Sequence, residues 1–162
     1  MSVVYDIKKV KLFNNIKIDI SILEELIRSG MYAITLRNVT PWHFIALTQR
    51  DFFKTVKLTV PIVACNQYIV ILGDTECEPN LEFLKNDLAF STYNIIIRAK
   101  ELGLDSFFTY CFHIHEEHRL IHDFLKLPKN IIVYGIIAVG YAKEKGELEI
   151  KYFPDKMHIN SW

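Results

Sequence analysis

Histidine is concentrated in one short stretch of the sequence, where its spacing could serve metal chemistry. His118 and His122 are four residues apart and would share one face of a helix, and His113 and His115 lie just before them. Zinc sites use such pairs together with further ligands. The zinc-protease motif H-E-x-x-H is not completed, because Arg119 stands where its second histidine belongs. We therefore expect no metal site and interpret these histidines as a solvated helix face.

Cysteine is the second residue type that could do chemistry. Cys65, Cys77 and Cys111 are widely spaced and form no C-x-x-C pair, a pattern typical of a reduced, cytoplasmic protein. No motif places a base beside Cys111, so we interpret it as a buried structural thiol rather than a nucleophile.

The charges limit the possible partners. Lys+Arg and Asp+Glu number 19 each among 162 residues. This balance gives no broad basic surface for nucleic acid and no polybasic membrane patch. The longest apolar runs, residues 68–72 and 131–139, are far too short to span a bilayer. We therefore expect a cytoplasmic protein that binds neither nucleic acid nor membranes, and that binds anions through a few placed residues.

The longest predicted element is a helix over residues 80–102, with Gly103 where a terminator belongs. One face carries apolar residues at three- and four-residue intervals: Leu81, Leu84, Leu88, Ile95, Ala99 and Leu102. The other face is also apolar, with Phe83, Phe90, Tyr93, Ile96 and Ile97. A helix that is apolar nearly all round is usually buried on both sides, which indicates a subunit interface.

Two further helices are expected. Residues 21–24 have the form of a capping box and predict a helix to about residue 29, which Gly30 would end. The other helix covers residues 115–125.

Strands are predicted at residues 42–48, 61–72, 107–112 and 130–142, which are rich in β-branched and aromatic residues. Helices that alternate with strands predict an α+β fold (α/β layered), with a mixed central sheet flanked by helices, in one domain spanning residues 1–162.

Residues 33–44, A-I-T-L-R-N-V-T-P-W-H-F, resemble the motif A-P-S-x-x-N-x-Q-P-W-x-F of the nitroreductase-like flavoproteins. Further similarities follow in that family's order along the chain. Residues 99–104 resemble the end of its central helix, residues 125–128 its L-x-L-P turn, residues 139–141 its closing G-Y strand, and residues 151–162 its basic-Pro…His…Trp ending. The chain is thus identified as a short, divergent member of that family.

The resemblance implies an intertwined homodimer with a nitroreductase-like fold that holds two FMN molecules at its interface. It also implies NAD(P)H as co-substrate and a small-molecule electron acceptor such as a nitro compound or a quinone. The redox chemistry belongs to the cofactor, so no side chain is named as catalytic.

The family binds the FMN phosphate with an N-terminal R-x-S-x-[RK]-x-F stretch, which residues 7–13 resemble as I-K-K-V-K-L-F. Lys11 is in register, whereas Ile7 and Lys9 replace the Arg and the Ser. Lys8 or Lys9 would then substitute for the missing arginine, without its bidentate geometry. The alternative is a solvated basic turn.

The other implied cofactor residues are spread along the chain. Asn38 suits the pyrimidine edge of the flavin because it offers both a donor and an acceptor, and the alternative is an ordinary turn residue. Thr35 could donate its hydroxyl to the ribityl chain or the phosphate, and Thr40 replaces a glutamine. Lys151 is the C-terminal phosphate candidate. Trp42 is expected to pack in the core.

The family motif G-L-G-[ST]-x-W-x-G is the least well matched. Residues 103–110 read G-L-D-S-F-F-T-Y, so Asp105 and Tyr110 stand where glycines would. Glycine permits close backbone approach to a ligand, and a tyrosine could crowd the site or line it. We therefore place Thr109 and Tyr110 among the cofactor candidates.

Two functions remain open. The first is an FMN-dependent oxidoreductase that passes electrons from NAD(P)H to a small organic acceptor. The second is a non-catalytic protein that keeps the fold and binds flavin or another ligand. The departures at Ile7, Lys9, Thr40, Asp105 and Tyr110 favour the second hypothesis, because they all fall at cofactor positions.

Overall fold

The computed structural model describes residues 3–48, 64–112, 115–146 and 153–162. Within these ranges the elements follow in the order η1 (Val3–Asp6), β1 (Val10–Phe13), α1 (Ile20–Met31), β2 (Trp42–Leu47), β3 (Tyr68–Asp74), α3 (Leu81–Glu101), β4 (Asp105–Tyr110), α4 (His115–Leu125), β5 (Ile131–Gly140), β6 (Ala142–Lys145) and η2 (Pro154–Lys156).

The strands form one four-stranded sheet in the order β2-β3-β5-β4 and a two-stranded ribbon of β1 with β6. Every pair among the described strands is antiparallel. The α+β arrangement is confirmed, but the described sheet is antiparallel where we expected a mixed sheet. Alternation of helix and strand along the sequence does not fix strand direction, which explains the difference.

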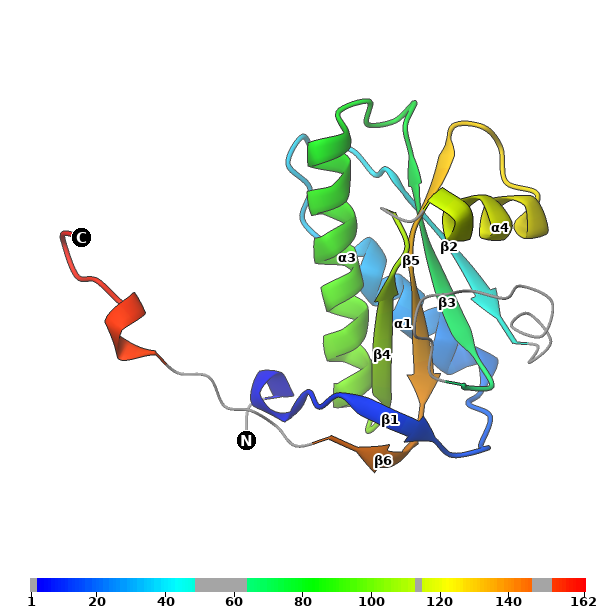
Figure 1. Ribbon diagram of the computed structural model, residues 1–162, viewed down its shortest axis with the longest axis horizontal. Coiled ribbons are helices and arrows are strands. Elements are labelled where there is room, and N and C mark those ends of the chain that lie inside the picture. The colour runs from blue at the N-terminus through cyan, green and yellow to red at the C-terminus, as the bar shows by residue number, and fades with distance from the viewer. Residues whose placement is uncertain (1–2, 49–63, 113–114, 147–152) are drawn as a thin grey trace.

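Both faces of the sheet are covered, as Figure 1 shows. Ile69, Ile71 and Ile137 lie in a core cluster with residues of α1 and α3. The intervening residues, such as Val70 and Ile136, lie in a second cluster with residues of α4 and β1. This alternation is the period of two that a strand imposes, and it explains why β3 and β5 are buried along almost their whole length.

Helix α3 confirms the prediction made for residues 80–102. Asn80 is the N-cap, and its side chain accepts hydrogen bonds from the backbone of Glu82 at 3.0 Å and Phe83 at 3.3 Å. Gly103 follows the C-cap with φ of 76°, a left-handed conformation that glycine adopts at little cost.

Helix α1 begins and ends differently from the prediction. Asp19, not Ser21, is the N-cap, and its side chain accepts from the backbone N of Ser21 at 2.9 Å. Gly30 lies inside the helix and does not end it. Its missing side chain lets α1 approach α3 closely. A Cβ there would lie 2.9 Å from Cδ1 of Ile95 and 3.0 Å from Oγ of Ser91.

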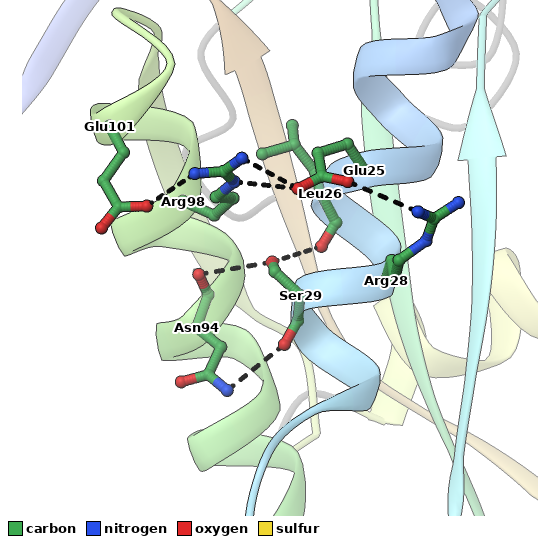
Figure 2. A network of polar contacts seen from close by, with 7 residues as sticks. All are labelled: Glu25, Leu26, Arg28, Ser29, Asn94, Arg98 and Glu101. Carbon is green, nitrogen blue, oxygen red and sulfur yellow. Dashed lines mark hydrogen bonds and ion pairs between the residues drawn. The ribbon is translucent and has the colours of Figure 1, made fainter.

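Polar contacts also join α1 to α3, as Figure 2 shows. Glu25 pairs with Nη2 of Arg98 at 2.9 Å, and Asn94 donates to the backbone oxygen of Ser29 at 3.3 Å. The two helices are therefore joined by polar contacts as well as by the close approach at Gly30.

Strand and helix boundaries differ most where the chain lacks clear turn residues. Helix α4 matches its prediction, whereas β3 begins at Tyr68 and β4 at Asp105. The predicted strand over residues 61–72 is therefore wrong at residues 64–67, and residues 61–63 lie outside the described ranges. The predicted strand over residues 130–142 divides into β5 and β6. No helix within the described ranges is long and apolar enough to cross a membrane.

Candidate functional site

The N-terminal lysines lie at the C-terminal end of α3. Lys8 is half-buried and Lys9 is exposed in the segment between η1 and β1, and neither side chain makes an ion pair with another described residue. Lys11 in β1 lies 3.6 Å from Glu144, and both side chains are exposed. Lys8 and Lys9 are therefore positive charges available to an anion.

A buried carboxylate lies beside these lysines. Asp105 is 7% exposed, and its oxygens lie 3.3 Å from Nζ of Lys100 and 2.8 Å from Nζ of Lys145. Burial disfavours the charged form of Lys100, but Asp6 and Asp105 outweigh burial and raise its pKa. The residue that replaces a family glycine is thus neutralised by two lysines and ties α3, β4 and β6 together.

A small crevice of about 10 Å³ forms here, lined by Ile7, Lys8, Ile96, Lys100, Leu104, Asp105 and Ser106. It is too small to hold FMN.

Three more candidates, Thr35, Asn38 and Thr40, lie on the loop of residues 32–41, between α1 and β2. Thr35 is half-buried, and Asn38 and Thr40 are exposed. Asn38 has φ of 56°, a conformation that asparagine tolerates better than most residues. Within the described part of the chain their side chains make no hydrogen bonds. The loop thus presents an amide and two hydroxyls that are free to bind a ligand.

The loop is held by two buried acids that the sequence did not single out. The backbone N of Leu36 donates to Oδ1 of Asp87 at 2.9 Å, and Arg37 lies 3.4 Å from Oε1 of Glu78. Both acids are almost completely buried. The position of Asp87 follows from the helix period, since it falls on the same face of α3 as Leu84, Leu88 and Ser91. An acid within that apolar stripe was the available signal for Asp87, whereas Glu78 precedes the helix.

Thr109 and Tyr110 lie at the far end of β4 from Gly103, about 17 Å along a strand of this length. Thr109 is 7% exposed and lies in the sheet opposite Ile136. Tyr110 packs against Tyr134, with ring centroids 5.1 Å apart. Burial raises the pKa of Tyr110 and raises that of Tyr134 to about 12, so both phenols are protonated at neutral pH. Lys151 lies outside the described residues.

One chain does not bring the candidates together. The loop contacts α3 at Asp87, whereas Lys8 lies beside Lys100, thirteen residues further along the helix. At 1.5 Å per residue the two groups are about 20 Å apart.

Two larger grooves are lined by other residues. One of about 520 Å³ lies between α1 and α3 and includes Tyr32, Tyr93, Arg28 and Arg98. The other, of about 430 Å³, lies at the β2 edge and includes His43, Asp74 and Asn130. Neither groove includes a predicted cofactor residue.

Two histidines of the predicted helix face, His118 and His122, contact the backbone of neighbouring segments. Nε2 of His118 accepts from the backbone N of Val133 at 3.1 Å, and Nε2 of His122 lies 3.1 Å from the backbone oxygen of Pro128. These contacts hold α4 against β5 and its preceding turn, so the predicted solvated face is wrong. The side chain of His115, and all of His113, lie outside the described part of the structure. Cys111 and Trp42 are buried, as predicted.

Comparison with known proteins extends these observations. No protein-family model matches the chain. An Archaeoglobus fulgidus protein, provisionally named NADH dehydrogenase/NAD(P)H nitroreductase, is 22% identical, covering 100% of this chain and 98% of that protein. A solved structure from Parabacteroides distasonis with the same provisional name is 27% identical, with a TM-score of 0.89 over 99% of this chain and 96% of that one. An FMN-dependent nitroreductase from Clostridium difficile is 18% identical, with a TM-score of 0.85 over 99% of both chains.

The chain therefore has the nitroreductase-like α+β fold. The resemblance that residues 33–44 carry extends along the whole chain and is confirmed.

Proposed function

We propose that this protein is an FMN-dependent oxidoreductase that passes electrons from NAD(P)H to a small organic acceptor such as a nitro compound or a quinone. The observation that carries the proposal is a set of polar side chains, at or beside the family's cofactor positions, that make no hydrogen bond or ion pair with another described residue. They are the cations of Lys8 and Lys9 and the loop residues Thr35, Asn38 and Thr40.

The chemistry of these groups fits FMN. Lys8 and Lys9 can neutralise a phosphate, and Lys11 and Lys151 are further candidates for that role. Asn38 can both donate to and accept from the pyrimidine edge of a flavin, and Thr35 can bond to the ribityl hydroxyls. FMN bound there would supply the redox chemistry.

Two copies of the chain would complete the site. Because the lysines and the loop are about 20 Å apart along α3, we propose that the lysines of one chain face the loop of a second chain across a homodimer interface. Exposed apolar residues near the loop support such an interface: Met31, Tyr32, Ile34 and Leu36 are all more than half exposed.

The protein's own part in the reaction is to bind and orient. Its nearby phenols, Tyr110 and Tyr134, stay protonated at neutral pH because burial raises their pKa, and we assign neither a role in proton transfer. Hydride transfer depends on proximity and stacking. Thr109 and Tyr110 remain candidates for lining the site, and Tyr110 lies close enough to Lys85 of α3 to feel its charge.

A second candidate function is a non-catalytic binding protein with the same fold. The specific observation in its favour is Asp105, which replaces a glycine of the family motif. Its carboxylate is buried and paired with Lys100 and Lys145, so it fills space where close approach to a flavin would need a bare backbone.

The visible absorption spectrum of the purified protein, recorded before and after addition of excess FMN and removal of the unbound fraction, separates these functions. We expect about one FMN per chain and bleaching by NADH or NADPH under anaerobic conditions. A protein that binds FMN but is not bleached would be a binding protein. A colourless protein that takes up no FMN would contradict the proposal.

A further inference from the structure

Asp87 is a buried carboxyl group with a single directed contact. The residue is 0% exposed, and its Oδ1 accepts a hydrogen bond from the backbone N of Leu36 at 2.9 Å. Its Oδ2 has no hydrogen-bond partner among the described residues. Burial raises the pKa of Asp87, and the nearby charge of Glu78 raises it further, against the effect of the Leu36 N–H. Burying a carboxyl group costs free energy unless it is hydrogen-bonded. The one hydrogen bond that Asp87 accepts from a described residue comes from the loop, at Leu36.

The contact lies at the middle of the loop of residues 32–41. The loop ends are tied elsewhere: the backbone N of Ala33 donates to the oxygen of Gly30 at 3.2 Å, and the backbone N of Asp74 donates to the oxygen of Pro41 at 2.7 Å. The side chain of Leu36 is half exposed and so buries little apolar surface. The hydrogen bond from its backbone N–H to Asp87 is therefore what anchors the middle of the loop.

A second acid supports the same turn more weakly. Arg37 lies 3.4 Å from Glu78 and 6.0 Å from the ring centroid of Phe83, but its side chain is 57% exposed. An exposed arginine loses much of its pairing energy to solvent. Asp87 therefore makes the stronger of the two contacts that fix the turn between Thr35 and Asn38.

We infer that Asp87 is a positioning residue, which holds the turn carrying Thr35 and Asn38 in the conformation that binds the cofactor and does so without touching the cofactor itself. The inference rests on the proposed function. If the turn adopted the binding conformation only one tenth of the time, the apparent affinity for FMN would fall tenfold.

Hydrogen exchange in the protein without FMN tests the anchor directly. We expect the amide of Leu36 to exchange at least about tenfold more slowly than that of exposed Ile34, whose backbone N donates no hydrogen bond to a described residue. In Asp87→Ala this protection should disappear while the amides of α3 stay protected. A Leu36 amide that exchanges as fast as that of Ile34 in the wild-type protein would overturn the inference, whether or not any variant folds.

FMN titration followed by flavin fluorescence tests the consequence. Asp87→Ala should weaken binding by about tenfold or more, since a turn that has lost its anchor and adopts the binding conformation one tenth of the time binds tenfold more weakly. Asp87→Asn keeps an acceptor for Leu36 and should restore affinity to within about threefold of wild type. Ser91→Ala is the matched control, because Ser91 is also buried, lies one turn away on α3, and has a hydroxyl without a partner among the described residues; its affinity should be unchanged.

The outcomes separate the two hypotheses. If wild type binds FMN and Asp87→Ala binds it equally well, the inference fails and the proposed function stands. If Asp87→Asn is as weak as Asp87→Ala, the charge rather than the anchor is responsible, and the inference also fails. If wild type takes up no FMN, the proposed function fails and the role of Asp87 toward the cofactor fails with it.

Discussion

Lys8 and Lys9 carry charges that no described carboxylate pairs with, and this makes them testable one at a time. If the role of Lys8 is to neutralise a phosphate, Lys8→Ala should weaken FMN binding by about three- to tenfold at low salt. The loss should shrink at high salt, which screens charges that are partly exposed. Isothermal titration at two salt concentrations measures both effects.

Lys129→Ala is the matched control for this experiment, because it removes the same charge from an exposed position between α4 and β5. Its FMN affinity should equal that of wild type at both salt concentrations. Equal losses in the two variants would indicate a general field effect, and a loss in Lys8→Ala that salt does not change would indicate packing instead of charge.

The raised pKa of Asp87 predicts a pH-dependent stability. The ordinary pKa of an aspartate is 3.8, and the folded protein holds the proton of Asp87 more tightly than the unfolded chain does. As the pH rises above 3.8 the unfolded chain loses this proton first, so Asp87 lowers the free energy of unfolding. Asparagine cannot ionise. The free energy of unfolding of Asp87→Asn, relative to wild type, should therefore increase as the pH rises above about 4.

Urea denaturation at several pH values measures this difference. Thr92→Val provides the control, since Thr92 is buried on the same helix and cannot titrate in this range; its difference from wild type should be independent of pH. A flat or falling difference for Asp87→Asn would show that its folded-state pKa is not raised.

The sequence predicted some site residues and missed others for identifiable reasons. Thr35 and Asn38 were found because they belong to a local motif, and the structure places both on one loop. Asp87 and Glu78 were missed, because the partners that give them a role are 51 and 41 residues away in the chain. Long-range contacts of this kind leave at most an indirect trace in one sequence, which for Asp87 is an acid within an apolar stripe of α3.

Helices α1 and α3 depend on a close approach at Gly30. A Cβ at this position would lie 2.9 Å from Cδ1 of Ile95, which is itself completely buried. Alanine is the better helix former by about 1 kcal/mol, but overpacking in a tight core costs about 1–3 kcal/mol. Gly30→Ala should therefore lower the free energy of unfolding, as measured by chemical denaturation.

A double mutant identifies the cause. Ile95→Val removes the methyl group that the new Cβ would meet, so Gly30→Ala should cost less in the Ile95→Val background than in wild type. Simple additivity of the two costs would contradict overpacking at this contact.

The elements were predictable to the extent that their ends carry local signals. Helix α3 has Asn80 and Gly103 at its two ends, and both do what their residue types predict. Helix α1 offers two candidate caps, Asp19 and Ser21, and the pattern S-x-x-E favoured the wrong one. Strand β1 was not predicted, because its four residues are stabilised by pairing with β6, from the other end of the chain.

The molecule exposes apolar surface that one chain does not cover. Phe90 and Tyr93 on α3 are 39% and 48% exposed. Residues 153–162 lie away from the sheet in Figure 1, with Ile159 74% and Trp162 100% exposed. Surface of this kind usually belongs to an interface, which supports the proposed homodimer and the apolar second face predicted for α3.

A charge on this face of α3 should dissociate the homodimer, and the same change should abolish FMN binding. Tyr93→Glu places a carboxylate in the proposed interface, where burying it without a partner would cost several kcal/mol (about 2–5). We expect wild type to sediment at twice its mass of 19.0 kDa with about one FMN per chain, and the variant to sediment as a monomer with little FMN.

Phe124→Glu is the control, because Phe124 is 43% exposed on α4, across the sheet, and this variant should remain a dimer. A dimeric Tyr93→Glu would move the interface away from α3, whereas a monomer that still binds FMN tightly would place the whole cofactor site within one chain.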